Sequence, residues 1–378
     1  MKKINILFLI TDLAKGGAER FLVDLCNDLI NNPEFEICIG SLFPANLFPE
    51  LDQRIRVEQL NYQSFSFKGK NECPKYKKLL ADFQPDIIHS NRFLGEFLSS
   101  YYVDPSIKYV CHGHDNMVQL KRLDAQTFAS KEKTLNYFER QWLYFKKYKK
   151  VPTHFIANST HTFDYYTNIL PRRQRGNVKL IQYGFDYNKY KIEKPKSISS
   201  HGKIRMINVG SYQKKKNQRF FIDVAEELIS RGIDFEINLI GDGGLRKSVE
   251  EEISSKKLEG FIKVRGIQHN VEKWYAESDI YVHAATYEPF GLVFLEAMSA
   301  GLPTITLDGK GNRDIIENDK NGYLLDESNA VQFADKIIEY AQDKEKYTAM
   351  SKFAQEYAKQ FDVSIKNEEL INFYKSIL

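Results

Sequence analysis

The sequence predicts an α/β protein made of two parallel-sheet domains. Its 378 residues exceed the usual size of one hydrophobic core. Short runs rich in β-branched residues alternate with amphipathic helical stretches, and this alternation occurs in two separate series. Residues 189–203 lie between the series, are rich in Lys, Ser and Pro, and predict a linker. We therefore expect one domain at residues 1–188 and a second at 189–361.

The elements of each series follow from hydrophobic periodicity. In the first series we expect strands at residues 4–10, 36–42, 86–90, 108–112 and 154–157, and helices at 18–30 and 74–83. In the second we expect strands at residues 204–210, 236–241, 261–266, 279–284 and 303–308, and helices at 219–230, 245–256 and 270–277. Strands that alternate with helices favour a parallel sheet in each domain.

Composition narrows the class of protein. With 42% hydrophobic and 28% charged residues, the chain is typical of a soluble globular protein. No apolar run is long enough to span a bilayer, and the run after Met1 is too short for a signal peptide. The four cysteines contain no C-x-x-C pair, so neither a zinc site nor a disulfide framework is indicated. We expect a reducing, cytoplasmic location.

Charge is divided unevenly along the chain. Residues 1–190 carry 27 Lys and Arg against 20 Asp and Glu, which gives +7, whereas the remainder carries −3. The stretch 142–150 places aromatic rings among ammonium groups, as in a segment that lies on anionic lipid. Its candidate membrane contacts are Trp142, Lys146, Lys147, Lys149 and Lys150. Solvated lysines over buried aromatic rings are the equally simple alternative. No nucleic-acid motif is present, and we expect no nucleic-acid partner.

Two carboxylates stand eight positions apart in the segment 288–296, Glu288 before a predicted helix and Glu296 within it. Pro289 suits the first position of that helix, and Gly291 allows a ligand to approach the backbone. Free amides at a helix N-terminus favour a diphosphate, and ionised carboxylates accept hydrogen bonds from sugar and ribose hydroxyls. The spacing therefore indicates a site for a sugar nucleotide. A helix with solvated acids and a buried apolar face has a similar pattern.

The segment resembles the signature of the family 4 retaining glycosyltransferases, which is E-x7-E followed by a small-residue helix and G-x-P. Glu288, Glu296, Gly301 and Pro303 stand in the matching positions. Further matching segments are Gly16-Gly17-Ala18-Glu19, His112-Gly113-His114-Asp115, Gly210 with Lys216-Asn217, and Gly241-Asp242-Gly243. The resemblance implies two Rossmann-like domains that face a cleft, the GT-B arrangement. The first domain would bind the acceptor, the second the nucleotide sugar, and a last helix at about residues 362–378 would cross back to the first.

The resemblance also implies roles for particular residues. Glu288 and His112 are the catalytic candidates, with Glu288 holding hydroxyls of the donor sugar and Glu296 holding the ribose. The donor-binding residues that it implies are Gly16, Gly17, Lys216, Gly241, Asp242, Gly243, Phe290, Gly291, Leu292 and Glu296. Ser211 occupies the position where the family has an arginine, so one cation for the diphosphate is replaced, with Lys214 or Lys215 as substitutes.

His112 ends an apolar strand and matches the histidine of the family's H-G-T-D segment, which contacts the donor sugar. His114 stands where that segment has threonine, so the choice of active histidine between His112 and His114 stays open. Asp115 is the candidate to orient either ring, and His114 and Asp115 are candidates on the acceptor side. A strand-end histidine bonded to backbone is the structural alternative.

The reaction that these residues favour is transfer of a hexose or N-acetylhexosamine from a nucleotide-diphosphate sugar, expected to be a UDP-sugar, with retention. The acceptor would be a hydroxyl of a saccharide or lipid-linked glycan in bacterial surface polysaccharide or glycolipid synthesis, at the inner face of the cytoplasmic membrane. The chain contains no D-x-D motif, and we expect no metal and no cofactor. A nicotinamide enzyme is disfavoured because the glycines after residue 240 lack the dinucleotide spacing. A nucleotide-sugar epimerase and a non-catalytic membrane-associated binding subunit are the alternatives.

Overall fold

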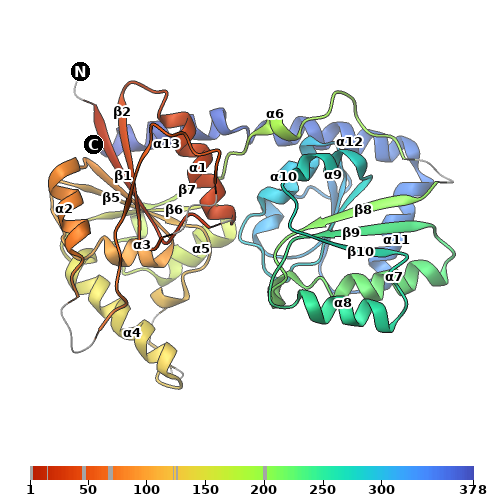
Figure 1. The fold of residues 1–378 in the computed structure, drawn as a ribbon, viewed down its shortest axis with the longest axis horizontal. Coiled ribbons are helices and arrows are strands. Elements are labelled where there is room, and N and C mark those ends of the chain that lie inside the picture. The colour runs from red at the N-terminus through yellow and green to blue at the C-terminus, as the bar shows by residue number, and fades with distance from the viewer. Residues whose placement is uncertain are drawn as a thin grey trace. The chain divides into compact units, whose positions relative to one another are not determined.

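In the computed structural model the chain divides into two compact units (Figure 1). The structure describes residues 3–14, 16–44, 48–66, 71–121, 123–124, 127–198 and 202–378. The first unit takes the chain up to Gly184 and adds Val363–Leu378, and the second is Phe185–Asp362. The division thus lies a few residues before position 188. Each unit has its own parallel sheet and its own hydrophobic core.

The first unit is built on a seven-stranded parallel sheet in the order β3-β2-β1-β4-β5-β6-β7. Its strands are β1 (Ile4–Ile10), β2 (Phe35–Ser41), β3 (Arg56–Gln59), β4 (Ile87–Asn91), β5 (Lys108–Gly113), β6 (Thr153–Ala157) and β7 (Val178–Leu180). The central strands β1, β4 and β5 are buried on both faces, which is why β1 contains a continuous run of Ile, Leu and Phe and not an alternating pattern.

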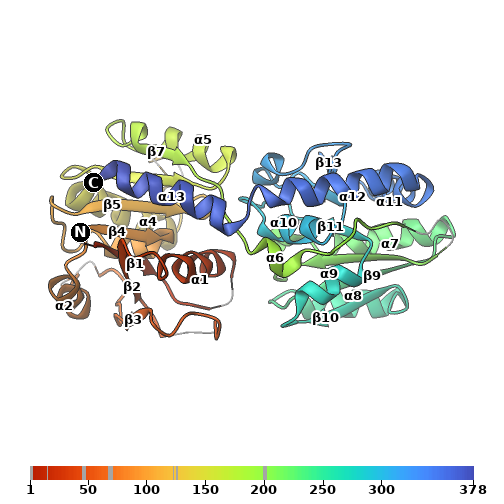
Figure 2. The ribbon, with the colours of Figure 1, turned by 90° about the horizontal axis from the view of Figure 1, so that it is seen from above.

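Helices connect these strands and cover the sheet (Figures 1 and 2). They are α1 (Gly17–Leu29), α2 (Pro74–Phe83), α3 (Arg92–Leu98), α4 (Lys131–Leu143), α5 (Thr160–Ile169) and the last helix α13 (Val363–Ile377), with a π-helical turn at Tyr144–Tyr148 and 3₁₀ turns at Val118–Leu120 and Arg175–Asn177. Helix α13, blue in Figure 1, belongs to this unit and packs beside α1, where Asn367 Nδ2 donates to Asp28 Oδ2 at 2.9 Å.

The second unit has a six-stranded parallel sheet in the order β10-β9-β8-β11-β12-β13. Its strands are β8 (Ile204–Val209), β9 (Phe235–Ile240), β10 (Ile262–Gly266), β11 (Ile280–His283), β12 (Thr304–Leu307) and β13 (Gly322–Leu325). Its helices are α6 (Tyr187–Tyr190), α7 (Phe220–Ser230), α8 (Arg246–Ser255), α9 (Val271–Glu277), α10 (Leu292–Ser299), α11 (Ala330–Gln342) and α12 (Lys344–Lys359), with 3₁₀ turns at Lys214–Lys216 and Gly311–Asp314. Both sheets, as predicted from the alternation of strands and helices, are parallel.

The segment after α6 is not the free linker that its composition predicts. The Lys196 ammonium donates to the carbonyl oxygens of Tyr275 at 2.9 Å and Ala276 at 2.6 Å, at the C-terminal end of α9. Ile198 is buried in the core of the second unit. Lys196, a cation at a helix C-terminus, and Ile198, a buried aliphatic side chain, therefore attach this polar segment to the second unit. Average composition does not predict either contact.

The helix that carries Glu296 begins later than predicted. Pro289 was expected at its first position, but α10 begins at Leu292, and Gly291 precedes it with φ 101°, in the left-handed region. Pro289 lies in the preceding loop, whose backbone bonds to the loop after β12 through Glu288 N–Gly309 O at 2.7 Å. The prediction of Pro289 as the first helical residue was therefore wrong. Glu288 still lies before the helix and Glu296 within it.

The stretch 142–150 is only partly exposed, which corrects one predicted membrane contact. Lys147 is fully buried, and its Nζ lies 2.8 Å and 2.9 Å from the two carboxylate oxygens of Glu96 and 2.7 Å from Ser99 Oγ. The π-helical turn accounts for this, because its extra residue turns Lys147 and Tyr148 inward together. Lys146, Lys149 and Phe145 point to solvent.

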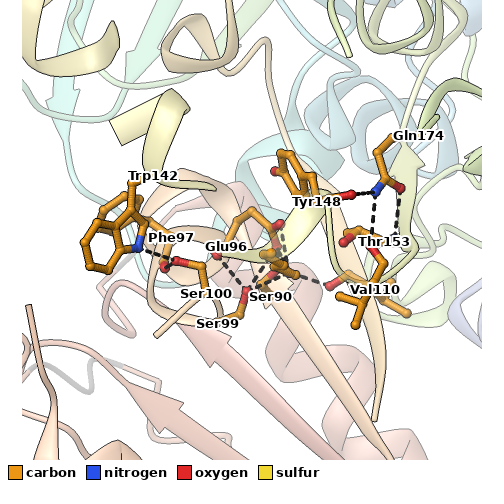
Figure 3. Close-up of polar contacts among 12 residues, drawn as sticks. Ser90, Glu96, Phe97, Ser99, Ser100, Val110, Trp142, Tyr148, Thr153 and Gln174 are labelled. Carbon is orange, nitrogen blue, oxygen red and sulfur yellow. Dashed lines mark hydrogen bonds and ion pairs between the residues drawn. The ribbon is translucent and has the colours of Figure 1, made fainter. Parts of the chain in front are cut away.

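Trp142 is half-buried and donates from Nε1 to Ser100 Oγ at 3.0 Å, so the indole is bonded to the turn that follows α3 (Figure 3). In the same view Ser90 Oγ donates to Glu96 Oε2 at 2.6 Å, and Gln174 bonds to Thr153 N and to the Tyr148 carbonyl. Buried polar contacts thus hold the C-terminal end of α4 and the π-helical turn that follows it against the rest of the first unit.

Among the residues that the structure describes, no helix combines the length and the apolar character needed to cross a bilayer. Cys26, Cys38, Cys73 and Cys111 are all buried and free.

Candidate functional site

The candidate donor site lies where the strand order of the second unit reverses. From β8 the chain adds β9 and β10 on one side, and then β11, β12 and β13 on the other. Open parallel sheets bind ligands at the carboxyl ends of the two strands that flank such a reversal. Lys216 lies in the 3₁₀ turn after β8, and Glu288 lies in the loop after β11. The two residues therefore stand on opposite sides of the switch point.

Glu288 is buried and lies against two basic side chains, Lys216 and His283. Its Oε2 accepts a short hydrogen bond from the Lys216 ammonium and lies 3.2 Å from His283 Nε2. His283 ends β11, and its Nδ1 lies 3.0 Å from the Tyr281 hydroxyl. Strand β11 positions both rings, because Tyr281 and His283 are two residues apart and point to the same face of the sheet. Tyr281, His283, Glu288 and Lys216 form one continuous polar chain.

The pKa values of this chain are shifted by burial and by the pairing. Burial raises the pKa of Glu288, but Lys216 and His283 outweigh it, and the net pKa lies well below the usual range. Burial lowers the pKa of His283 and exceeds the opposing effect of the Glu288 carboxylate. At neutral pH the site therefore holds a carboxylate, an ammonium and a neutral imidazole.

Close backbone packing fixes the position of Glu288. A methyl group on Gly291 would lie 2.4 Å from Phe294 Cδ2 and 3.1 Å from Glu288 Cγ, and the φ of 101° also favours glycine. A methyl group on Gly311 would lie 1.9 Å from the Pro289 carbonyl oxygen. The loops after β11 and β12 thus touch through glycines, and neither loop can shift without moving Glu288.

Phe290, a predicted donor-binding residue, is buried and packs against Phe361 with ring centroids 6.1 Å apart. Its side chain therefore supports the loop, and its contribution to a ligand would come from the backbone. Leu292 begins α10, where the first amides of a helix have no acceptor within the helix. These amides remain the predicted partners of a diphosphate.

Glu296 lies one turn into α10 and is half-buried. Its Oε2 accepts a hydrogen bond from the Tyr275 hydroxyl at 3.0 Å. Tyr275 is buried at the end of α9, and burial raises the pKa of its phenol well above the usual value, so it stays a donor. A carboxylate held in this way has oxygen lone pairs left for a pair of vicinal hydroxyls.

Gly241, Asp242 and Gly243 follow β9 in a loop that passes directly over the end of β8. A methyl group on Gly241, whose φ is 134°, would lie 2.1 Å from the Gly210 carbonyl oxygen, so glycine is needed there for packing. The Asp242 carbonyl accepts from Tyr212 N at 3.0 Å, and the Asp242 carboxylate is exposed. Ser211, at the position where the family has an arginine, immediately precedes Tyr212. Of the two lysines predicted to substitute for that arginine, Lys214 is exposed and Lys215 lies over the Tyr287 ring.

The first unit has its own reversal of strand order, between β1 and β4. Gly16 is the residue before α1, and Gly17 begins that helix with open space where a Cβ would be. The Glu19 side chain folds back over Gly16, is buried and pairs with Arg92 at 3.2 Å between Oε1 and Nη1. Burial raises the pKa of Glu19 against the opposing effect of Arg92. Each unit therefore places an ion pair across its switch point.

Three histidine rings stack at the carboxyl ends of β4 and β5. The ring centroid of His112 lies 4.5 Å from that of His114 and 5.4 Å from that of His89. The nitrogens of His114 are bonded to the Tyr183 hydroxyl and to Asn91 Oδ1, and His89 Nδ1 is bonded to the Tyr374 hydroxyl of α13. Neither nitrogen of His112 has a hydrogen-bond partner among the described residues.

The hydrogen-bond partners of the two candidate histidines, His112 and His114, differ. His114 is oriented by Asn91 and Tyr183 and not by Asp115, the residue predicted to orient a ring. Both nitrogens of the buried His112 ring lack a hydrogen-bond partner among the described residues. Burial, followed by the neighbouring histidines, holds the pKa of His112 well below the usual value, and burial lowers that of His89 to about 3. All three rings are neutral at pH 7, since burial and then Arg92 depress His114 as well.

The neutral stack predicts acid-sensitive stability. The unfolded chain takes up protons on these histidines below pH about 6.5, and the folded chain does not, so stability is present above that pH and is lost below it. We expect the free energy of unfolding to fall by up to about 1.4 kcal/mol per pH unit for each histidine, measured by urea denaturation between pH 7 and 5.

The matched control is His89→Gln. It should reduce the pH dependence of the free energy of unfolding by the contribution of one histidine, up to about 1.4 kcal/mol per pH unit. Comparison with wild type cancels the opposite effect of Glu139, whose pKa is raised by burial to about 7. An equal slope in the two proteins would contradict the assignment.

Among the described residues, no group of three or more His, Cys, Asp or Glu side chains is arranged to hold a metal ion.

Comparison with known proteins assigns the second unit to a protein family. Residues 189–357 match the family model described as glycosyl transferases group 1. The second unit belongs to that family. The chain is 26% identical over 186 residues to N-acetyl-alpha-D-glucosaminyl L-malate synthase of Bacillus anthracis, a match that spans 49% of this chain and 48% of the relative. It therefore spans about half the length of this curated relative. It is also 22% identical to an uncharacterized glycosyltransferase of Haemophilus influenzae over the full length of both.

The fold comparison extends to both units of the chain. The crystal structure of Anabaena Alr3699/HepE in complex with UDP and glucose matches with a TM-score of 0.78 and 23% identity, over 98% of this chain and 99% of that chain. The fold is GT-B, with two Rossmann-like units, as the sequence predicts.

The sequence analysis missed His283 and Tyr281 as site residues. It identified residues 279–283 only as a strand, although a histidine at the carboxyl end of a strand that feeds the Glu288 loop was a usable signal. Asn91 and Tyr183 were missed for another reason. They are distant in sequence from His114, and only the sheet brings them to it.

Proposed function

We propose that this protein is a retaining glycosyltransferase that moves a hexose or N-acetylhexosamine from a UDP-sugar to a hydroxyl of a saccharide or lipid-linked glycan. The observation that carries the proposal is the Lys216–Glu288 pair across the switch point of a group 1 unit. The relatives support the donor class, since one is named for N-acetylglucosaminyl transfer and one was crystallised with UDP and glucose. Synthesis of a bacterial surface polysaccharide or glycolipid is the setting we propose.

In this proposal the second unit binds the donor. Glu296 accepts from the ribose hydroxyls, Glu288 from the sugar hydroxyls, and Lys216 with the first amides of α10 neutralises the diphosphate. These groups supply the positive charge that a leaving diphosphate needs, and we propose that no metal is required. The first unit binds the acceptor, and its candidate catalytic side chain is His112, whose two ring nitrogens have no hydrogen-bond partner among the described residues.

The chemical step that we propose takes place on one face of the sugar. The bond between the anomeric carbon and the β-phosphate oxygen breaks, the acceptor oxygen bonds to the same carbon, and the acceptor proton passes to the leaving phosphate. Glu288 is a poor nucleophile for an alternative covalent route, because Lys216 and His283 already occupy its carboxylate. Trapping of a covalent glycosyl-enzyme would contradict this step, and product with an inverted anomeric centre would contradict retention.

Calorimetric titration tests the donor site. We expect UDP to bind the wild-type protein more tightly than GDP or ADP, with no loss of affinity in EDTA. Glu296→Ala should weaken UDP about tenfold, because it removes the acceptor for the ribose hydroxyls, a loss of roughly 1.4 kcal/mol. The matched control is Glu251→Ala, an exposed carboxylate on α8, which should bind as wild type does.

If no nucleotide binds, the non-catalytic alternative replaces the proposal. Conversion of the UDP-sugar without an acceptor would instead indicate an epimerase.

We also propose that the first unit binds an anionic membrane through the exposed part of the stretch 142–150, at the inner face of the cytoplasmic membrane. Phe145 has 55% of its surface exposed, and the Lys149 ammonium lies 5.9 Å from its ring centroid. Lys146 and Lys150 are also exposed, whereas Lys147 is buried and takes no part. An exposed ring among ammonium groups matches the interface of a bilayer that carries negative charge.

Vesicle co-sedimentation tests this surface. Lys149→Glu with Lys150→Glu should reduce binding to phosphatidylglycerol vesicles about tenfold or more, since each basic residue contributes about 1 kcal/mol. Lys247→Glu, at a side chain 88% exposed in the second unit, is the matched control and should bind normally. Equal binding of all proteins, or binding to uncharged phosphatidylcholine vesicles, would contradict the proposal.

A further inference from the structure

His283 is a buried histidine of the second unit to which the sequence and the family comparison assign no role. Its ring is 1% exposed and lies between two polar groups, with Tyr281 on the Nδ1 side and Glu288 on the Nε2 side. The Phe294 ring packs edge-on against it with centroids 4.8 Å apart. The imidazole is therefore held on three sides, by side chains of β11, the Glu288 loop and α10.

The neighbours decide the tautomer of this ring. Glu288 is ionised and can only accept, so the neutral imidazole carries its proton on Nε2, the nitrogen that lies 3.2 Å from the carboxylate oxygen. Nδ1 is then an acceptor, and the Tyr281 hydroxyl donates to it across 3.0 Å. Tyr281 is buried and stays protonated, because burial raises the pKa of its phenol well above the usual value.

Glu288 is thus held by two donors of different kinds. Lys216 is an ammonium on a flexible chain with 16% of the side chain exposed, whereas His283 is a rigid, neutral ring inside the sheet. Under the proposed function Lys216 pairs with the donor diphosphate, which competes for the same ammonium. The contact of His283 Nε2 with Glu288 Oε2 at 3.2 Å is the one that such competition leaves in place.

We propose that His283 is a positioning residue, which holds the Glu288 carboxylate toward the hydroxyls of the donor sugar while Lys216 turns to the diphosphate. This inference rests on the proposed function and adds separate roles for the two side chains that contact Glu288. Tyr281 orients His283, His283 orients Glu288, and Glu288 contacts the sugar. Binding of UDP, which lacks the transferred sugar and its hydroxyls, does not depend on the chain Tyr281–His283–Glu288, and binding of the UDP-sugar does.

The test compares two variants and two ligands. His283→Leu removes the donor at Nε2, and His283→Gln places an amide nitrogen where Nε2 lies. For His283→Leu we expect UDP affinity within twofold of wild type, and an affinity for UDP-glucose or UDP-N-acetylglucosamine, whichever binds wild type, lowered about tenfold. His283→Gln should restore most of the lost affinity. Equal losses for UDP and the UDP-sugar, or no loss for either, would overturn the inference.

A second measurement needs no core variant. Nitrogen-detected histidine spectra of the wild-type protein, in which the contact with the Phe294 ring assigns the His283 signal among the eight histidines, should show the ring neutral and protonated at Nε2. A proton on Nδ1 would overturn the inference even if the variants fail to fold. Failure of the proposed function has a different signature, since wild type itself would then bind no UDP-sugar.

Discussion

Replacing Glu288 by glutamine is expected to lower kcat/KM for sugar transfer by a factor of roughly 100 or more, the size of effect seen when one preorganised group is removed from an active site. The substitution keeps the shape of the side chain but removes the charge that Lys216 and His283 face. The Lys216 ammonium then loses its counter-charge in a partly buried site, and the sugar hydroxyls lose a strong acceptor. Steady-state transfer from the UDP-sugar measures the loss.

The matched control is Glu345→Gln, which alters an exposed carboxylate on α12 and should leave transfer unchanged. Because the pKa of Glu288 is far below neutral, the carboxylate stays ionised through the physiological range, and its titration should not appear in the pH–rate profile above pH 5. Transfer by Glu288→Gln within threefold of wild type would remove this residue from the proposed site.

The largest expected effect on stability is at Lys147. Lys147→Met should lower the free energy of unfolding by about 3–5 kcal/mol, because it leaves the Glu96 carboxylate buried without its counter-charge. The pair lies in the core of the first unit, where side-chain exposure is 1% for Lys147 and 0% for Glu96. Denaturant-induced unfolding, followed by a signal from the first unit, measures the change.

A double variant separates the effect of an unpaired charge from that of lost packing. Lys147→Met combined with Glu96→Leu removes both charges, and the two serines around them keep other acceptors, the Val110 carbonyl for Ser90 and the backbone carbonyl of residue 96 for Ser99. Its stability should return to within about 2 kcal/mol of wild type. Lys149→Met, at an exposed neighbour, should change stability by less than about 0.5 kcal/mol. A double variant no more stable than Lys147→Met alone would contradict this explanation.

The fold was predictable because its strands are buried on both faces. The continuous apolar run at residues 6–10 marks a central parallel strand whatever packs on it. The short edge strands β3, β7 and β13 were not predicted, since strands of three or four residues lack a periodic signal. The late start of α10 was missed because Pro289 is compatible with a helix start, whereas the contact with the loop after β12 holds it in the loop.

The candidate site was predictable where its residues lie close together in the sequence, as Glu288 and Glu296 do. It was not predictable where contacts depend on strand order. His283 meets Glu288 because β11 ends beneath that loop, and Lys216 reaches it because β8 pairs with β11. Lys147 shows the same limit in the core. A lysine-rich stretch predicts exposed side chains, but the π-helical turn directs Lys147 inward, where it pairs with Glu96, a residue distant in the sequence.

The return of α13 to the first unit has a consequence for the order of folding during synthesis. The second unit is encoded by one continuous stretch, Phe185–Asp362, and can close as soon as that stretch leaves the ribosome. The first unit emerges earlier but waits for Val363–Leu378, which bring Tyr374 to His89 and Asn367 to Asp28. The unit that is translated first is therefore the one completed last, and its histidine stack stays uncovered until then.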